Sequence, residues 1–129
     1  MPKIYLSPST QDWNMYVTGS GSEEYNMNLL ADALVPYLLS NGIQYQRNRP
    51  EMTAGSSIRE ANQGEYDLYL ALHSNAAPEG RYGEERGIIA FYYPGSVGGQ
   101  RAAELIAQEL RKIYPLPNKV TTRPTTSLG

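Results

Sequence analysis

The chain has 129 residues, which is the size of one compact domain. Eleven basic and thirteen acidic residues give a formal net charge of -2, which argues against a nucleic-acid-binding protein because such proteins carry a basic excess. The chain has no cysteine, so disulfides, thiolate metal sites and a cysteine nucleophile are excluded. His73 is its single histidine, and any site that needs an imidazole must therefore use it.

The N-terminal segment has no feature of a targeting signal. The apolar run Ile4–Leu6 is too short for a signal-peptide core. No stretch of the chain reaches the ~20 consecutive apolar residues of a membrane span. We therefore expect no membrane span, no signal peptide and synthesis in the cytoplasm.

The first 75 residues predict strands that alternate with helices. A Ser-x-x-Glu pattern formed by Ser20 and Glu23 predicts a helix start, and apolar residues at spacings of three and four then continue to about Ser40. Pro36 lies inside this helix and should kink its last turn. The other predicted elements are a strand over Lys3–Leu6, a polar loop over Ser7–Ser22, a strand over Ile43–Arg47, a helix over Ser56–Asn62 and a strand, buried on both faces, over Asp67–His73.

The remaining residues continue the same alternation. We predict a polar turn over Ala76–Glu85, a strand over Gly87–Tyr93 and a helix from Ala102 to about Tyr114. The segment Thr121–Gly129 is polar and contains no predicted element, so we expect the domain to be incomplete at its C-terminus. The order of elements predicts an α/β fold, with a mostly parallel sheet and helices on both faces.

Polar side chains with catalytic potential gather where the predicted strands end. In open α/β sheets the ligand site lies beyond the carboxyl ends of the strands. The loop after the first strand, Glu23 with Glu24, and His73 with Asn75 all fall there. A carboxylate and an imidazole predict either a zinc site or a general acid–base pair. Capping and the helix dipole also explain the two glutamates, and a hydrogen-bonded structural role also explains the histidine.

One segment resembles a known family. Leu72-His73-Ser74-Asn75-Ala76 resembles the S-x-H-x-N-A segment of the zinc-dependent N-acetylmuramoyl-L-alanine amidases, the type-3 amidase family. Four further segments match the family, in the family's order along the chain. Lys3–Pro8 resembles its opening strand and D-P-G-H-G-G turn, and Glu23 resembles its glutamate ligand. Arg49 with Arg59–Asn62 resembles its T-R and R-x-x-x-A-N positions, and Gly87–Tyr93 resembles the strand after its histidine.

The resemblance implies a fold and a reaction. The fold is the three-layer amidase fold, with residues 1–129 as one catalytic domain that is incomplete at its C-terminus. The reaction is metal-assisted hydrolysis of the amide bond between N-acetylmuramic acid and L-alanine in peptidoglycan. The implied cofactor is Zn²⁺, held by Glu23 and His73, with Glu24 as the alternative carboxylate. Acidification should release the metal because a ligating imidazole must be unprotonated.

This sequence departs from the family at one metal ligand. The family's first histidine ligand falls at Thr10, so zinc binding should be weak because hydroxyl and amide oxygens are poor zinc donors. Gln11, Asp12 or Asn14 could approach the metal instead. The resemblance gives Thr10, Gln11 and Asn75 substrate-binding or supporting roles.

The catalytic general base is not assigned within the chain. The family's catalytic glutamate would lie beyond Gly129, so the 129 residues alone are expected to be inactive. The alternative function is a degenerate member of the family that binds muropeptide without hydrolysis. A nucleotide- or sugar-binding α/β module is a third possibility, although the chain has neither a G-x-G-x-x-G motif nor a phosphate loop. The oligomeric state stays open.

Overall fold

The computed structural model describes residues 2–12, 15, 19, 21–74 and 87–126. The chain divides into two compact units, one up to residue 75 and one over residues 76–128. In chain order the elements are β1 (Lys3–Pro8), α1 (Glu23–Ser40), β2 (Gln44–Arg47), α2 (Ala54–Gln63), β3 (Leu68–Leu72), β4 (Ile88–Tyr92), α3 (Val97–Arg111), a 3-10 turn (Pro117–Lys119) and β5 (Val120–Pro124). These elements form small parallel sheets with three helices among the described residues, which confirms the prediction of an α/β protein.

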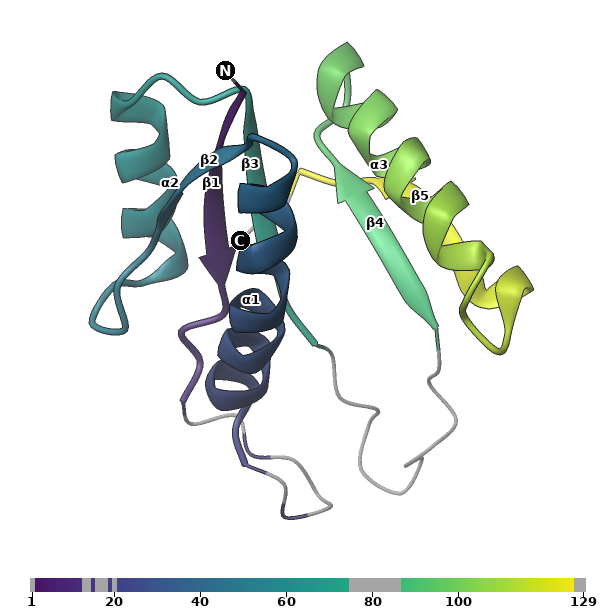
Figure 1. Cartoon of the computed structure of the whole chain (residues 1–129), viewed down its shortest axis with the longest axis horizontal. Coiled ribbons are helices and arrows are strands. Elements are labelled where there is room, and N and C mark those ends of the chain that lie inside the picture. The colour runs from purple at the N-terminus through teal and green to yellow at the C-terminus, as the bar shows by residue number, and fades with distance from the viewer. Residues whose placement is uncertain (1, 13–14, 16–18, 20, 75–86, 127–129) are drawn as a thin grey trace. The chain divides into compact units, whose positions relative to one another are not determined.

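The first unit is built on a three-stranded parallel sheet in the order β2-β1-β3. β1 is the central strand, and the chain crosses from β1 to β2 through α1 and from β2 to β3 through α2. Parallel crossovers are right-handed, so two crossovers that run in opposite directions across the sheet put their helices on opposite faces. Figure 1 shows α1 and α2 on the two sides of this sheet.

The apolar core of the first unit lies between the sheet and α1. Ile4 and Leu6 alternate along β1 and point to the same face, because side chains of a strand repeat every two residues. They pack against Ala31 and Leu38, which are two turns apart on α1. Partly buried side chains extend this core: Leu34, Val35, Ile43, Tyr45, Leu68, Leu70 and Leu72.

The α2 face of the same sheet is aromatic and polar. The Tyr5 ring is fully buried, stacks on Tyr69 with ring centroids 5.6 Å apart, and meets the edge of Tyr66 at 5.3 Å. Its hydroxyl donates to Glu60 Oε1 on α2 at 3.1 Å. Tyrosine suits this position because it offers an apolar ring and a polar tip. Burial, with a smaller effect of the Glu60 carboxylate, raises the pKa of Tyr5 well above its usual value.

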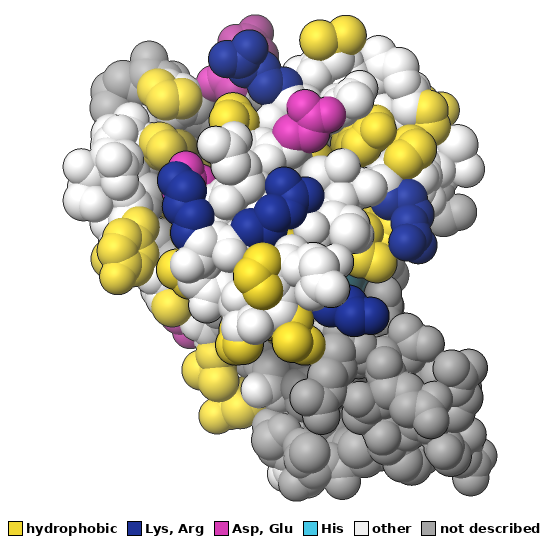
Figure 2. Space-filling model, turned by 90° about the vertical axis from the view of Figure 1, so that its right-hand side faces the viewer, with side chains coloured by type: hydrophobic (Ala, Val, Ile, Leu, Met, Phe, Trp, Pro, Cys, Tyr) yellow, Lys and Arg dark blue, Asp and Glu magenta, His cyan; other side chains and the backbone are white. Residues whose placement is uncertain are grey.

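The second unit consists of the parallel pair β4 and β5 with α3 packed on both strands. Its buried side chains are Val120 on β5 and Ala103 with Ala107 on α3. Arg111 Nε at the end of α3 donates to the Val120 carbonyl at 3.0 Å, which ties the helix to the last strand. On the face drawn in Figure 2, basic side chains are interspersed with separate apolar groups, so neither kind forms a continuous patch there.

Two predicted boundaries in the first unit are wrong by a few residues. β1 continues through Pro8 instead of ending at Leu6, because β3 pairs with it as far as Pro8↔Leu72. The pairing with β2 already ends at Leu6↔Arg47, so the missing N–H of Pro8 has no strand to donate to on that side. The N-cap of α1 is Ser22, whose side chain accepts from Tyr25 N, and not Ser20, which lies outside the described residues. β3 is only partly buried along its length, so the prediction of full burial on both faces is also wrong.

The prediction of a polar tail without structure is wrong for its first part. Val120–Pro124 forms β5, in register with β4 from Ile88↔Val120 to Tyr92↔Pro124. The predicted polar turn Ala76–Glu85 lies outside the described residues. Among the described helices, none combines the length and the apolarity that crossing a bilayer requires.

Candidate functional site

The exits of β1 and β3 are held side by side at the carboxyl edge of the first unit's sheet. Ser9 N donates to the Leu72 carbonyl at 2.9 Å, which extends the ladder one step past the end of β1. The residues that follow each strand therefore start from neighbouring positions. This places Ser9 and Thr10 on the same side of the unit as His73.

Glu23 and His73 are brought into contact at this edge. Glu23 is the first residue of α1, and its Oε1 lies 3.1 Å from His73 Nδ1. The same oxygen accepts a hydrogen bond from Ser74 N at 3.1 Å, so the carboxylate is oriented by the backbone after β3. The Glu23 side chain is 2% exposed and that of His73 is 31% exposed. The histidine ring thus reaches solvent, while its carboxylate partner is buried.

The contact distinguishes between the two adjacent glutamates. Glu23 approaches the histidine, whereas the carbonyl of Glu24 accepts from the Asn28 side chain within α1. Gln11 links the loop after β1 to this helix start, since its carbonyl accepts from Glu24 N at 3.4 Å. The helix N-terminus also favours a carboxylate in its first turn, which suits Glu23 to this position.

A cleft of about 420 Å³ opens beside the histidine. One wall is the exit of β1, the other is the segment between β2 and α2, and His73 also lines the cleft. The predicted residues Thr10, Gln11 and Asp12 all line it. The complete lining is Ser7, Pro8, Ser9, Thr10, Gln11, Asp12, Asn48, Pro50, Glu51, Met52, Thr53, Ala54 and His73. Its size suits a peptide or a sugar fragment, and its lining is rich in hydroxyl and amide groups.

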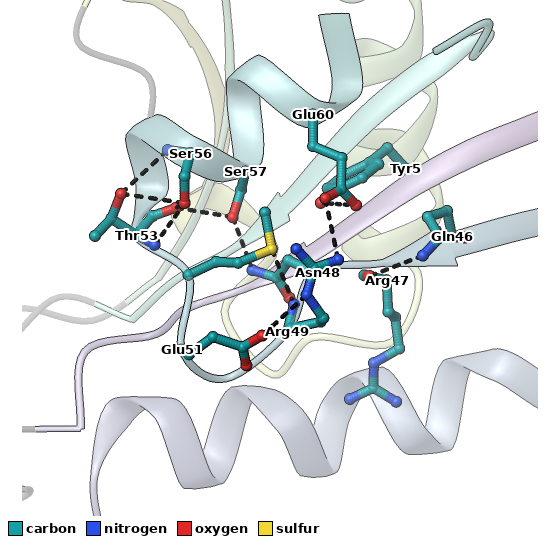
Figure 3. Close-up of polar contacts among 11 residues, drawn as sticks. Tyr5, Gln46, Arg47, Asn48, Arg49, Glu51, Thr53, Ser56, Ser57 and Glu60 are labelled. Carbon is teal, nitrogen blue, oxygen red and sulfur yellow. Dashed lines mark hydrogen bonds and ion pairs between the residues drawn. The ribbon is translucent and has the colours of Figure 1, made fainter. Parts of the chain in front are cut away.

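Arg49 fixes the outer part of the second wall. Its Nε bonds Glu51 Oε1 at 2.9 Å and its Nη1 bonds Glu60 Oε2 at 3.1 Å (Figure 3). The hydrogen bond to Glu51 and the nearby charge of Glu60 raise the pKa of Arg49 above its already high usual value. Glu60 also accepts the hydroxyl of Tyr5, so this wall is connected to the central strand through α2.

Asn48, which also lines the cleft, was not predicted as a site residue. Asn48 follows directly after β2, and its side chain contacts β1 and α2. The same rule that selected His73 could have found it, because it is a polar residue at the carboxyl end of a parallel strand.

The donor types of the Glu23–His73 pair fit a zinc ion. Zinc takes imidazole nitrogen and carboxylate oxygen, and catalytic sites use three protein ligands plus water. Thr10 and Gln11 add neutral oxygens on the same cleft, and such oxygens are weaker donors. Within the part of the chain that the structure describes, no group of three or more His, Cys, Asp or Glu side chains is arranged around a common metal position. Asn14 and Asn75 lie outside the described residues.

Comparison of the chain with protein-family models, with curated proteins and with solved structures finds no match.

Proposed function

We propose that this chain is a zinc-dependent peptidoglycan amidase that cleaves the amide bond between N-acetylmuramic acid and L-alanine. The observation that carries the proposal is the 3.1 Å contact between Glu23 Oε1 and His73 Nδ1 beside an open polar cleft. These are the two residues that the resemblance to the type-3 amidases selects as metal ligands. The proposal includes the finer fold of that family, a three-layer domain with a mostly parallel sheet. It also includes action at the cell wall after export or release.

The chain's own residues supply binding and orientation. Glu23 and His73 would hold the metal, and Ser74 N fixes the orientation of the carboxylate. Such a hydrogen bond to a ligand is a common way of holding a metal site rigid. When bound, zinc lowers the pKa of a water molecule to about 7 and polarises a carbonyl group. Thr10 and Gln11 line the cleft and would hydrogen-bond the polar groups of a muropeptide.

Zinc titration by calorimetry tests the metal site. Glu23→Gln keeps the shape of the side chain but removes its charge, so zinc binding should be lost. Glu24→Gln makes the same change one residue along α1 and is the matched control, which should bind like the unchanged protein. His73→Ala should also abolish binding. Equal zinc affinity in the unchanged protein and Glu23→Gln would reject the assignment, and loss in Glu24→Gln alone would move the ligand by one residue.

Peptide release from purified peptidoglycan tests the reaction. The protein encoded by the whole reading frame is used, because the resemblance places the general base after Gly129. Loss of a general base typically lowers the rate 10²- to 10⁴-fold, so the 129 residues alone are expected to release no measurable peptide. An N-acetylmuramic acid end and a free L-alanine amine must appear together in the products of the whole protein. Products with any other new ends would reject the proposed bond.

A second function is favoured by Thr10. A hydroxyl replaces the imidazole at the position where the resemblance places the first metal ligand, and this weakens zinc binding. The chain would then bind muropeptide in the same cleft without hydrolysis. Sedimentation with cell-wall sacculi, without peptide release by the whole protein in excess zinc, would select this second function over the first.

A further inference from the structure

Three polar side chains, of Ser7, Asn48 and Ser57, are hydrogen-bonded to one another beside the cleft. Ser7 on β1 is 4% exposed and Ser57 on α2 is fully buried. The Asn48 side chain lies between them, with its Nδ2 at 3.2 Å from the hydroxyl oxygen of each. Figure 3 shows its contact with Ser57. The same nitrogen lies 3.0 Å from the carbonyl oxygen of Pro8. One amide therefore contacts two elements that are far apart in the sequence.

The network determines which way this amide faces. The Pro8 carbonyl can only accept, so the atom of Asn48 that lies 3.0 Å away must be the nitrogen. The Ser57 hydroxyl donates to the Thr53 carbonyl at 2.8 Å, and the Tyr69 hydroxyl donates to Ser7 Oγ at 2.9 Å. The Pro8 carbonyl and the Ser57 oxygen, whose hydrogen goes to Thr53, can therefore only accept from Asn48. The position thus requires a donor, which an aspartate at neutral pH cannot provide.

The contacts of Asn48 join the two walls of the cleft. Pro8 ends β1, and the wall formed by Ser9 to Asp12 continues from it. Thr53 caps α2 and lies on the opposite wall, one helical turn before Ser57. The backbone N–H of Asn48 also donates to the Leu6 carbonyl at 3.2 Å. Asn48 is therefore anchored to β1 and holds the second wall against it.

We propose that Asn48 is a positioning residue, which sets the spacing between the two walls of the cleft. Thr10 and Gln11 on the first wall then face the segment 50–54 at a fixed separation. The identity of the ligand that the cleft binds rests on the proposed function. The spacing between the two walls does not, because it is a property of the protein without ligand.

The test compares two Asn→Asp variants. Asn48→Asp keeps the side-chain shape but turns a carboxylate toward the Pro8 carbonyl and the Ser57 oxygen, which both accept. Asn41→Asp is the matched control, because the exposed Asn41 side chain at the end of α1 also donates a hydrogen bond, to the Tyr37 carbonyl at 2.7 Å. The chain has no cysteine, so spin labels on Asp12→Cys and Ala54→Cys report the distance between the walls alone. Circular dichroism establishes that each variant is folded.

The expected result is a longer and broader distance distribution in Asn48→Asp at pH 7, and an unchanged distribution in Asn41→Asp. Lowering the pH to about 5 should restore the distribution in Asn48→Asp, because a carboxyl group among acceptors protonates readily and then donates to Pro8. Recovery in acid would show that the charge of the new carboxylate causes the change. An unchanged distance in folded Asn48→Asp, or equal broadening in Asn41→Asp, would overturn the proposal.

A milder variant covers the case in which Asn48→Asp does not fold. Ser57→Ala removes the acceptor on α2, together with the hydrogen bond that Ser57 donates to the Thr53 carbonyl, and it should broaden the distribution while leaving the contact to Pro8 in place. An unchanged distribution in Ser57→Ala would then overturn the proposal. All of these measurements are made without metal or substrate. Failure of the unchanged protein to bind zinc or peptidoglycan would therefore reject the proposed function without contradicting the positioning role of Asn48.

Discussion

The buried Tyr5 hydroxyl should make the first unit less stable as the pH rises into the alkaline range. Burial of the ring, and then the hydrogen bond to Glu60, raise the pKa of Tyr5 in the folded chain. In the unfolded chain a tyrosine titrates near 10. A group whose pKa is raised on folding contributes stability below its unfolded pKa and loses that contribution as the pH rises. At pH 11 the folded phenol is still neutral while the unfolded one is mostly ionised, which costs about 1.4 kcal/mol for one tyrosine.

Tyr5→Phe removes this dependence. Urea unfolding followed by circular dichroism at pH 9 and pH 11 gives the loss of unfolding free energy over that interval. The loss should be smaller in Tyr5→Phe than in the unchanged chain by about 1.4 kcal/mol. Burial also raises the pKa of Tyr69, but that residue is present in both proteins and its effect cancels. Tyr37→Phe is the control, because the Tyr37 ring is 70% exposed. Equal losses in Tyr5→Phe and the unchanged chain would refute the reasoning.

Two further predictions concern single residues. Ser22→Ala removes the side chain that caps α1 through Tyr25 N, and should lower the free energy of unfolding by about 1 kcal/mol; a thermal melt with no shift would contradict the cap. Gly87 has a φ of +132°, and an added Cβ would lie 2.4 Å from the Lys119 carbonyl oxygen. Gly87→Ala should therefore weaken the pairing of β4 with β5 and speed amide hydrogen exchange in both strands. Unchanged exchange would contradict this prediction.

The helices and most strands could be predicted because each has a strong local pattern. The apolar spacing of α1 located its end at Ser40, as the structure has it. β5 was missed because Thr121 and Thr122 give Val120–Pro124 no apolar alternation, and Pro124 reads as a terminator. The pairing with β4 that makes this segment a strand is a long-range contact, which no local window contains.

The contact between Glu23 and His73 could be predicted from the sequence, and the walls of the cleft could not. Glu23 and His73 lie 50 residues apart, yet topology brings both to the carboxyl edge of one parallel sheet. The second wall depends on how Arg49 and Asn48 reach α2 and β1, and those contacts follow from side-chain geometry. A residue type alone does not specify which of several polar neighbours it will bond.

The central place of β1 has a consequence for synthesis on the ribosome. Lys3 pairs with Gln44 and Pro8 pairs with Leu72, so β1 is made first but its pairing is complete only when β3, the last strand of the first unit, has been made. Until Leu72 has left the exit tunnel, Ile4 and Leu6 have no complete sheet to join. α1 and α2 are stabilised by contacts within their own turns and can form in the meantime, since local contacts cost little loop entropy. Nascent chains should therefore acquire helix well before they acquire the sheet, and the cleft should open only after β3 has closed against β1.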